Sequence, residues 1–237
     1  MFTIAAWFAC TTTPAWLDPP PSLEDADCAP DTDGSTIAPG VTLPLRIRVG
    51  AGLDPAEAAF HTQWAGAYWR SRGVVPSIAA PWGRTRDAEV FREAADDLSA
   101  LVEPLRDHLE RPARPWVDVV FVSRLATPTS PAARYFAPLV GFTVADPDLK
   151  ELHAVAREAT PTVFVALEAA RRLPRERARF VLAHELGHAL SLGHVAERGN
   201  LMGPGFPRCP PGLDASQEQA IREWAGRTRS RGRTKAR

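Results

Sequence analysis

The chain has 237 residues, of which 45% are hydrophobic and 24% charged, a composition that predicts a globular protein with room for one sizeable core. Its 28 basic and 28 acidic residues cancel, so net charge gives no global case for attraction to nucleic acid or to a membrane surface. No internal stretch approaches the roughly 18 consecutive apolar residues that a membrane span requires.

The two ends of the chain carry opposite charges. Residues 18–33 hold six acidic residues and no basic one, whereas residues 227–237 hold six basic residues and no acidic one. Both ends are expected to be solvated and flexible, and the alternative for the C-terminal end is a specific basic interaction arm. We therefore divide the chain into an apolar segment at residues 1–10, a proline-rich acidic linker at 11–40, one folded domain at 41–226 and a basic flexible tail at 227–237.

The N-terminal segment ends in Cys10 and resembles the tail of a bacterial lipoprotein signal, whose cysteine is acylated after cleavage. It lacks the usual basic start, and the alternative is an apolar stub. The resemblance implies a secreted or cell-envelope protein that contacts the membrane only through a lipid anchor at Cys10. Cys28 and Cys209 would then either form a disulfide in an oxidising compartment or remain two separate thiols.

The first part of the domain predicts two strands and two helices. Residues 41–49 end in a strict polar–apolar alternation, which is typical of a strand. Asp54 followed by proline predicts the start of a helix that continues to about Ser71. Residues 73–78 indicate a second strand, and residues 87–110 have a helical periodicity that an internal proline would kink or split.

The second part of the domain predicts further strands and then helices. Residues 116–122 and 162–167 are β-branched and aromatic runs that fit buried strands. Pro174 opens a helix expected over residues 175–190. Asp214 is the expected cap of a last helix.

The helix over residues 175–190 carries the residues with the clearest chemistry. His184, Glu185 and His188 have the H-E-x-x-H spacing, and about 3.6 residues per helical turn place both imidazoles on one face, where they can bind one zinc ion. Glu185 is rotated by about 100° from His184, so it can reach a metal-bound water and take its proton. For these residues taken alone, the alternative is an amphipathic helix with two surface histidines.

His194 is the candidate third ligand. It lies six residues after His188, so on a continuous helix it would point away from the first two histidines. It reaches the same ion only if the helix ends and the chain turns back, and Gly193 offers the backbone freedom for such a reversal. Three protein ligands with a fourth position left for water are the usual composition of a catalytic zinc site.

The pattern resembles the metzincin clan of zinc proteases, in which H-E-x-x-H-x-x-G-x-x-H is followed by a methionine-containing Met-turn. Met202 stands eight residues after His194, in a Leu-Met-Gly-Pro run similar to that of the matrixin branch. In that family the methionine forms an apolar floor beneath the metal, and the segment after it walls the substrate pocket. The resemblance implies these roles for Met202 and for Gly203 and Pro204, whereas Met202 considered alone would be an ordinary core methionine.

Ser191 departs from the family pattern, which has glycine at this position. The glycine usually adopts a backbone conformation that costs a residue with a Cβ about 1 kcal/mol. Either Ser191 adopts this conformation, or the helix ends later and Gly193 makes the turn.

Residues 139–144 form the candidate edge strand, which matters because main-chain hydrogen bonds to a sheet edge can align an extended peptide. The candidate positions are Leu139, Val140, Gly141 and Phe142. Gly141 would allow close approach of a backbone, and the outward-facing N–H is expected at Val140 or Phe142. The alternative is a central strand in which Gly141 marks a bulge.

These features imply an α+β, metzincin-like zincin fold: a twisted mixed five-stranded sheet with an active-site helix, a Met-turn and a C-terminal helix. The resemblance is closest to a bacterial matrixin-like protein and implies a zinc-dependent endopeptidase with one catalytic Zn²⁺ and Glu185 as the base. The expected partner is a peptide or protein substrate, with no nucleic acid, and the chain is expected to be a monomer. Two other classes remain open, namely a zinc amidase acting on a non-peptide substrate and a binding module whose zinc is catalytically idle.

Overall fold

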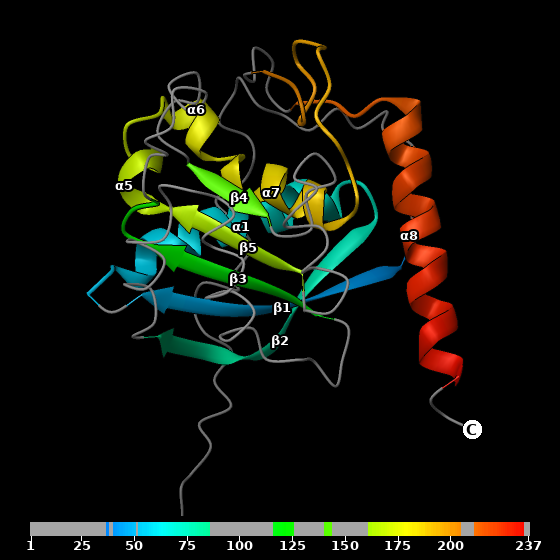
Figure 1. The fold of residues 1–237 in the computed structure, drawn as a ribbon, viewed down its shortest axis with the longest axis horizontal. Coiled ribbons are helices and arrows are strands. Elements are labelled where there is room, and N and C mark those ends of the chain that lie inside the picture. The colour runs from blue at the N-terminus through cyan, green and yellow to red at the C-terminus, as the bar shows by residue number, and fades with distance from the viewer. Residues whose placement is uncertain are drawn as a thin grey trace, which may run out of the picture.

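The computed structural model describes residues 37, 40–50, 52–85, 116–125, 140–143, 161–204 and 211–234, and these contain a mixed sheet with helices packed against it (Figure 1). The strands are β1 (Val41–Gly50), β2 (Val74–Thr85), β3 (Val117–Val122), β4 (Gly141–Thr143) and β5 (Thr162–Ala166). Their order across the sheet is β2-β1-β3-β5-β4. The first four strands in this order are parallel, and β4 lies antiparallel to β5 at the edge.

Several expectations from the sequence concern residues outside this description. These are the helix over residues 87–110, most of the linker at 11–40, the apolar segment at 1–10, the residue Leu139, and the cysteines Cys10, Cys28 and Cys209. Within the described residues, no helix is both long enough and apolar enough to cross a membrane.

The burial pattern explains why the strands lie where they do. In β1, Leu43, Leu45 and Ile47 point into the core, and the residues between them are more exposed, so this strand has one buried face. In β3 and β5 every residue is buried, which matches their mostly β-branched and aromatic composition. The buried Asp118 of β3 is paired with Arg46 of β1. Strands β3 and β5 therefore occupy the middle of the sheet.

Helix α1 (Pro55–Arg70) begins as the sequence predicts, with the Asp54 side chain accepting a hydrogen bond from the backbone N–H of Ala56 at 2.9 Å. Its buried Trp69 donates its indole N–H to the carbonyl oxygen of Ala183 at 3.2 Å. Helix α1 thus packs directly against the segment that carries the candidate zinc ligands.

The helix expected over residues 175–190 is divided into α6 (Arg175–Ala178) and α7 (Val181–Ala189), and α5 (Leu167–Ala170) precedes them. Between α6 and α7, Phe180 adopts φ −104° and ψ 0°, and its N–H bonds the carbonyl of Arg177 three residues back. The Phe180 ring is buried against the rings of Trp64 and Tyr68 on α1. Aromatic packing across the two helices is therefore the physical reason for the break.

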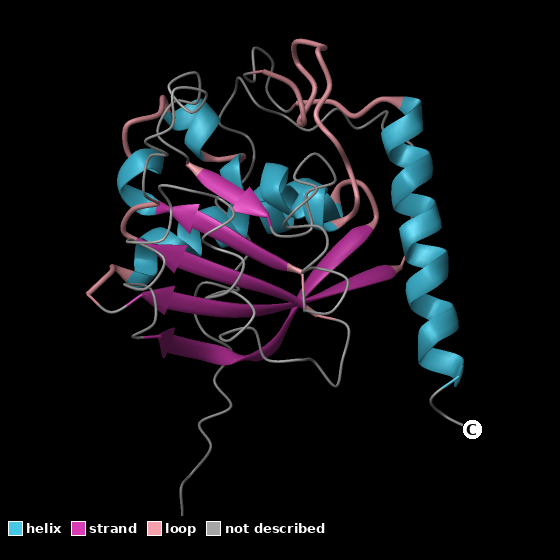
Figure 2. Cartoon of the chain, in the orientation of Figure 1, coloured by secondary structure: helices cyan, strands magenta, loops and turns pink. Residues whose placement is uncertain are grey.

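The last helix, α8 (Ala215–Thr234), continues beyond the domain end expected at Gly226, so residues 227–234, which were expected in a flexible tail, are helical in the structure. Arginine is a good helix former, and positive charge is favourable near a helix C-terminus, which accounts for the extension. Figure 2 shows α8, the longest of the described helices, at one side of the sheet, whereas α7 lies beside β4 and β5. The buried Ile221 and Ala225 attach α8 to the core.

Candidate metal centre

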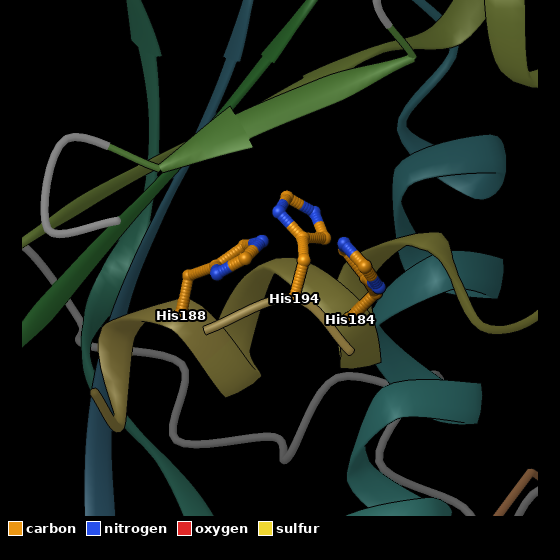
Figure 3. Close-up of side chains that lie close together, drawn as sticks. All are labelled: His184, His188 and His194. Carbon is orange, nitrogen blue, oxygen red and sulfur yellow. The ribbon is translucent and has the colours of Figure 1, made fainter. Parts of the chain in front are cut away.

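Three histidines converge at the C-terminal end of α7. His184 and His188 project from the helix and His194 from the segment that follows it, and their rings face a common point (Figure 3). One ligand atom of each lies within 4.8 Å of the others. Of the described residues, these are the ones whose geometry suits a metal ion. His188 is buried, His184 is half-buried and His194 is exposed. The centre is therefore open to solvent on the side of His194.

Backbone carbonyls orient two of the three rings. The Nδ1 of His184 lies 2.7 Å from the carbonyl oxygen of Leu201, and the Nδ1 of His188 lies 2.8 Å from that of Leu192. A carbonyl can only accept, so Nδ1 carries the hydrogen in each ring and Nε2 presents its lone pair. Histidines that bind a metal usually donate the N–H of the other ring nitrogen to such an oxygen, so these residues fit a zinc ion.

Ser191 makes the chain reversal after α7. It has φ 72°, whereas Gly193 is not among the described residues with positive φ. The N–H of Leu192 bonds the carbonyl of Gly187 at 3.0 Å, and the N–H of Ser191 bonds the carbonyl of His188 at 2.8 Å, which together form a Schellman motif. Of the two alternatives, the one in which Ser191 adopts the glycine-like conformation therefore holds.

The turn around Met202 packs against the middle of α7. Met202 is fully buried, and its Sδ lies only 2.6 Å from the place where a Cβ on Gly187 would stand. Gly187 lies between His184 and His188 in the sequence, so the thioether packs against the helix segment that carries both histidines. The Met202 N–H is bonded to the Asn200 side-chain oxygen at 2.8 Å, which fixes the turn locally.

Gly203 and Pro204 follow at the rim of this turn. Gly203 is buried, and any Cβ there would collide with the carbonyl oxygen of Glu197, so glycine is required by close backbone contact. Pro204 is exposed.

The start of α8 fixes the turn from the other side. Asp214 and Gln217 form a reciprocal capping box: the Asp214 carboxylate accepts the Gln217 N–H at 2.9 Å, and Gln217 Oε1 accepts the Asp214 N–H at 2.9 Å. Hydrogen bonds from Ser216 and from the Gln217 backbone hold the pKa of Asp214 below its usual value. Gln217 Oε1 also accepts from the Asn200 amide at 2.8 Å. Asp214 was predicted from the sequence as a helix cap, whereas the roles of Asn200 and Gln217 were not, although Asp-x-x-Gln before a helix is typical of a capping box.

Glu185 lies beside the histidines and faces the edge strand. It is 6% exposed, and the hydroxyl of Thr143 in β4 is 2.8 Å from its Oε2. Thr143 is a further residue that the sequence analysis did not identify, because it is 42 positions away from Glu185 in the chain.

Within the described residues 140–143 the edge strand covers Gly141–Thr143, and its outward donors differ from those predicted. The Ala166 N–H bonds the Val140 carbonyl at 2.8 Å, and Phe142 is paired with Phe164. Because bonding pairs alternate along an antiparallel ladder, the backbone groups of Val140 and Phe142 face β5, and the N–H groups of Gly141 and Thr143 face outward. The expectation of an outward N–H at Val140 or Phe142 was therefore wrong.

No protein-family model and no curated protein sequence matches this chain. Its fold is similar to that of an archaemetzincin from Methanopyrus kandleri, with a TM-score of 0.50 and 15% identity over 78% of this chain and 96% of the other. Metalloproteinase-II from Bacteroides fragilis matches with a TM-score of 0.45 and 16% identity over 81% of this chain and 55% of that protein. The first likeness shows the fold, a mixed α/β architecture shared with an archaemetzincin, and the matrixin branch is not distinguished by it.

Proposed function

We propose that the protein is a zinc-dependent endopeptidase of the metzincin-like kind. The observation that carries the proposal is the convergence of His184, His188 and His194, whose ligand atoms lie within 4.8 Å of one another. Glu185 is the next residue after His184 in the same helix. The likeness in fold to an archaemetzincin supports it.

In this proposal the three histidines hold one zinc ion through nitrogen atoms. When bound, the ion would polarise the scissile carbonyl and lower the pKa of a coordinated water. Glu185 would take the proton from the attacking water and pass it to the leaving amine, which is the role of a general base that then acts as an acid. Its position one residue after His184 keeps it next to the ligands without being one of them.

The surrounding residues receive the roles that the resemblance implies. Met202 would be the floor of a Met-turn, supported by its burial against Gly187. Gly203 and Pro204 would wall the substrate pocket. Strand β4 would align an extended peptide through the outward N–H groups of Gly141 and Thr143.

The test uses purified full-length protein loaded with zinc. We expect one equivalent of zinc, cleavage of a peptide library with a consistent preference, and loss of cleavage on adding a chelator. Glu185→Ala should abolish cleavage and keep the metal, whereas Glu176→Ala, an exposed glutamate on α6, should change neither. A folded protein that binds no zinc would refute the proposal.

The same measurements separate the two alternative classes. Turnover of small amides without peptide cleavage would indicate a zinc amidase on a non-peptide substrate. Tight zinc without any turnover would indicate a binding module. A secreted or cell-envelope location and the closer kinship to matrixins are further parts of the proposal, and labelling of Cys10 by a lipid precursor in the native host tests the first.

A further inference from the structure

Two residues of β4 contact the carboxylate of Glu185 from across the sheet edge. Gly141 and Thr143 are two positions apart, so they present the same face of the strand to α7. Thr143 makes a hydrogen bond to this carboxylate. Gly141 leaves room for it because glycine has no Cβ. Together they surround a side chain that is 6% exposed.

Thr143 supplies the hydrogen bond. It is completely buried, and its Oγ1 lies 2.8 Å from Glu185 Oε2 and 2.9 Å from the Glu185 carbonyl oxygen. Both of these atoms accept, so the hydroxyl donates its single hydrogen to one or the other. A bond to a charged carboxylate is stronger than one to a neutral carbonyl, and it holds the side chain in one rotamer.

Gly141 supplies the space. A Cβ on this residue would stand 2.7 Å from Glu185 Oε1, 2.8 Å from its Cγ and 2.9 Å from its Cδ. All three are closer than real Cβ atoms approach, and all three belong to the same carboxylate side chain. Any larger residue at position 141 must therefore displace Glu185. Gly141 was expected from the sequence to leave room for an approaching backbone, whereas in the structure this space is occupied by the Glu185 side chain.

We propose that Gly141 and Thr143 are positioning residues that hold the Glu185 carboxylate where it works as the base. This inference rests on the proposed endopeptidase activity. It gives β4 a second task, because the strand that would align the peptide also fixes the residue that activates water. A misplacement of about 1 Å is enough to reduce turnover by about a hundredfold, so a modest shift of the carboxylate would be measurable.

The activity test compares variants of the zinc-loaded full-length protein. Thr143→Val keeps the shape but removes the donor, and we expect kcat to fall by about ten- to a hundredfold with KM and zinc content little changed. Thr143→Ser restores a hydroxyl and should recover most of the loss. Thr62→Val is the matched control, since Thr62 is a buried threonine whose hydroxyl bonds a helix carbonyl, that of Ala58, and kcat should stay the same. If Thr143→Val keeps the wild-type kcat, the inference is wrong.

A second measurement needs no activity. In thermal unfolding of the metal-free protein, Gly141→Ala should lower the midpoint in the wild-type background but not in Glu185→Ala, because the three atoms that its Cβ meets are then gone. If Gly141→Ala lowered the midpoint equally in the wild-type and Glu185→Ala backgrounds, the inference would be wrong. This test remains decisive even if Thr143→Val does not fold. If no variant and no wild-type protein cleaves peptides, the proposed function fails, and this cycle still decides whether Gly141 leaves the space that the Glu185 side chain occupies.

Discussion

At Ser191 the chain places a side chain in a backbone region that glycine enters more easily. The residue has φ 72° and is exposed, and its N–H bonds the His188 carbonyl to close α7. A left-handed conformation costs a residue with a Cβ roughly 1–2 kcal/mol. The reversal that brings His194 back to the first two histidines is therefore achieved with local strain.

Relieving this strain should stabilise the protein. We expect Ser191→Gly to raise the free energy of unfolding by about 1 kcal/mol, with zinc content unchanged, as measured by chemical denaturation and metal analysis. Ser71→Gly is the control, since Ser71 ends α1 at φ −60° and the same replacement there should destabilise. If Ser191→Gly lowered the free energy of unfolding, the backbone at Ser191 would not be strained.

A second residue-scale effect concerns His61, which is 2% exposed and packs beside Phe60 and Phe121. Burial lowers its pKa, and a hydrogen bond with the Ala178 backbone and the charge of Glu57 oppose this only in part. The folded protein therefore holds this ring neutral over a range in which the unfolded chain would protonate it.

The sign of the pH effect follows from this difference. The unfolded chain, with a histidine pKa of about 6.5, binds the proton more readily, so the stabilising contribution is complete above that pH and decreases as the pH falls toward the lower folded pKa. We expect unfolding measured on metal-free protein to lose at most about 1.4 kcal/mol per pH unit below pH 6.5 through this group. The difference in stability between wild type and His61→Gln should change with pH over this range, and a constant difference would show that His61 does not titrate on unfolding.

At the scale of elements, the turn around Met202 and the start of α8 form one hydrogen-bonded unit. Gln217 Oε1 accepts from both the Asn200 amide and the Asp214 N–H. Leu201, whose carbonyl orients His184, is also bonded through its N–H to the Gly212 carbonyl at 2.8 Å. The ligand geometry of His184 thus depends on a helix that contributes no ligand.

Gln217→Ala removes the shared acceptor. Because two buried or half-buried donors lose their partner, we expect a loss of about 1–3 kcal/mol in unfolding free energy and weaker zinc binding in a competition titration. Gln217→Glu keeps an acceptor and should recover part of the loss. Gln219→Ala, at an exposed position of the same helix, should change stability by less than about 0.5 kcal/mol.

The position of β4 at the sheet edge leads to a separate prediction about where a peptide substrate binds. If a peptide pairs with this edge, the outward amides of Gly141 and Thr143 should exchange hydrogen rapidly in the free protein and slowly with a non-hydrolysable peptide bound. The Phe142 amide, which faces β5, should be protected in both states. Amide exchange followed by NMR distinguishes these residues, and unchanged exchange at 141 and 143 on binding would place the peptide elsewhere.

The sequence predicts those parts of this architecture that arise from local spacing. Alternation predicts β1, β-branched and aromatic runs predict β3 and β5, and the Asp-Pro pair predicts the start of α1. The break at Phe180 was not predictable, because it depends on aromatic rings that belong to α1. For the same reason Thr143 was missed, since nothing near it in the chain indicates that it meets Glu185.

At the scale of the whole molecule, metal binding and folding should be coupled. A ligand that binds only the folded protein stabilises it by about 4 kcal/mol at a thousand times its dissociation constant. We expect zinc to raise the thermal midpoint in calorimetry and His194→Ala to lose most of this increase, because only two of the three clustered nitrogen ligands remain. An equal increase in the variant would mean that His194 does not bind the ion.

The bonds between the turn and α8 also have a consequence for the order of assembly. A chain leaves the ribosome N-terminus first, so His184, His188 and His194 emerge before Gln217 and the rest of α8. Until α8 folds, Asn200 lacks its partner and the carbonyl that orients His184 is not yet held in place. The three ligands therefore emerge before the helix that fixes the turn beside them, so the centre is completed only after α8 has emerged and folded.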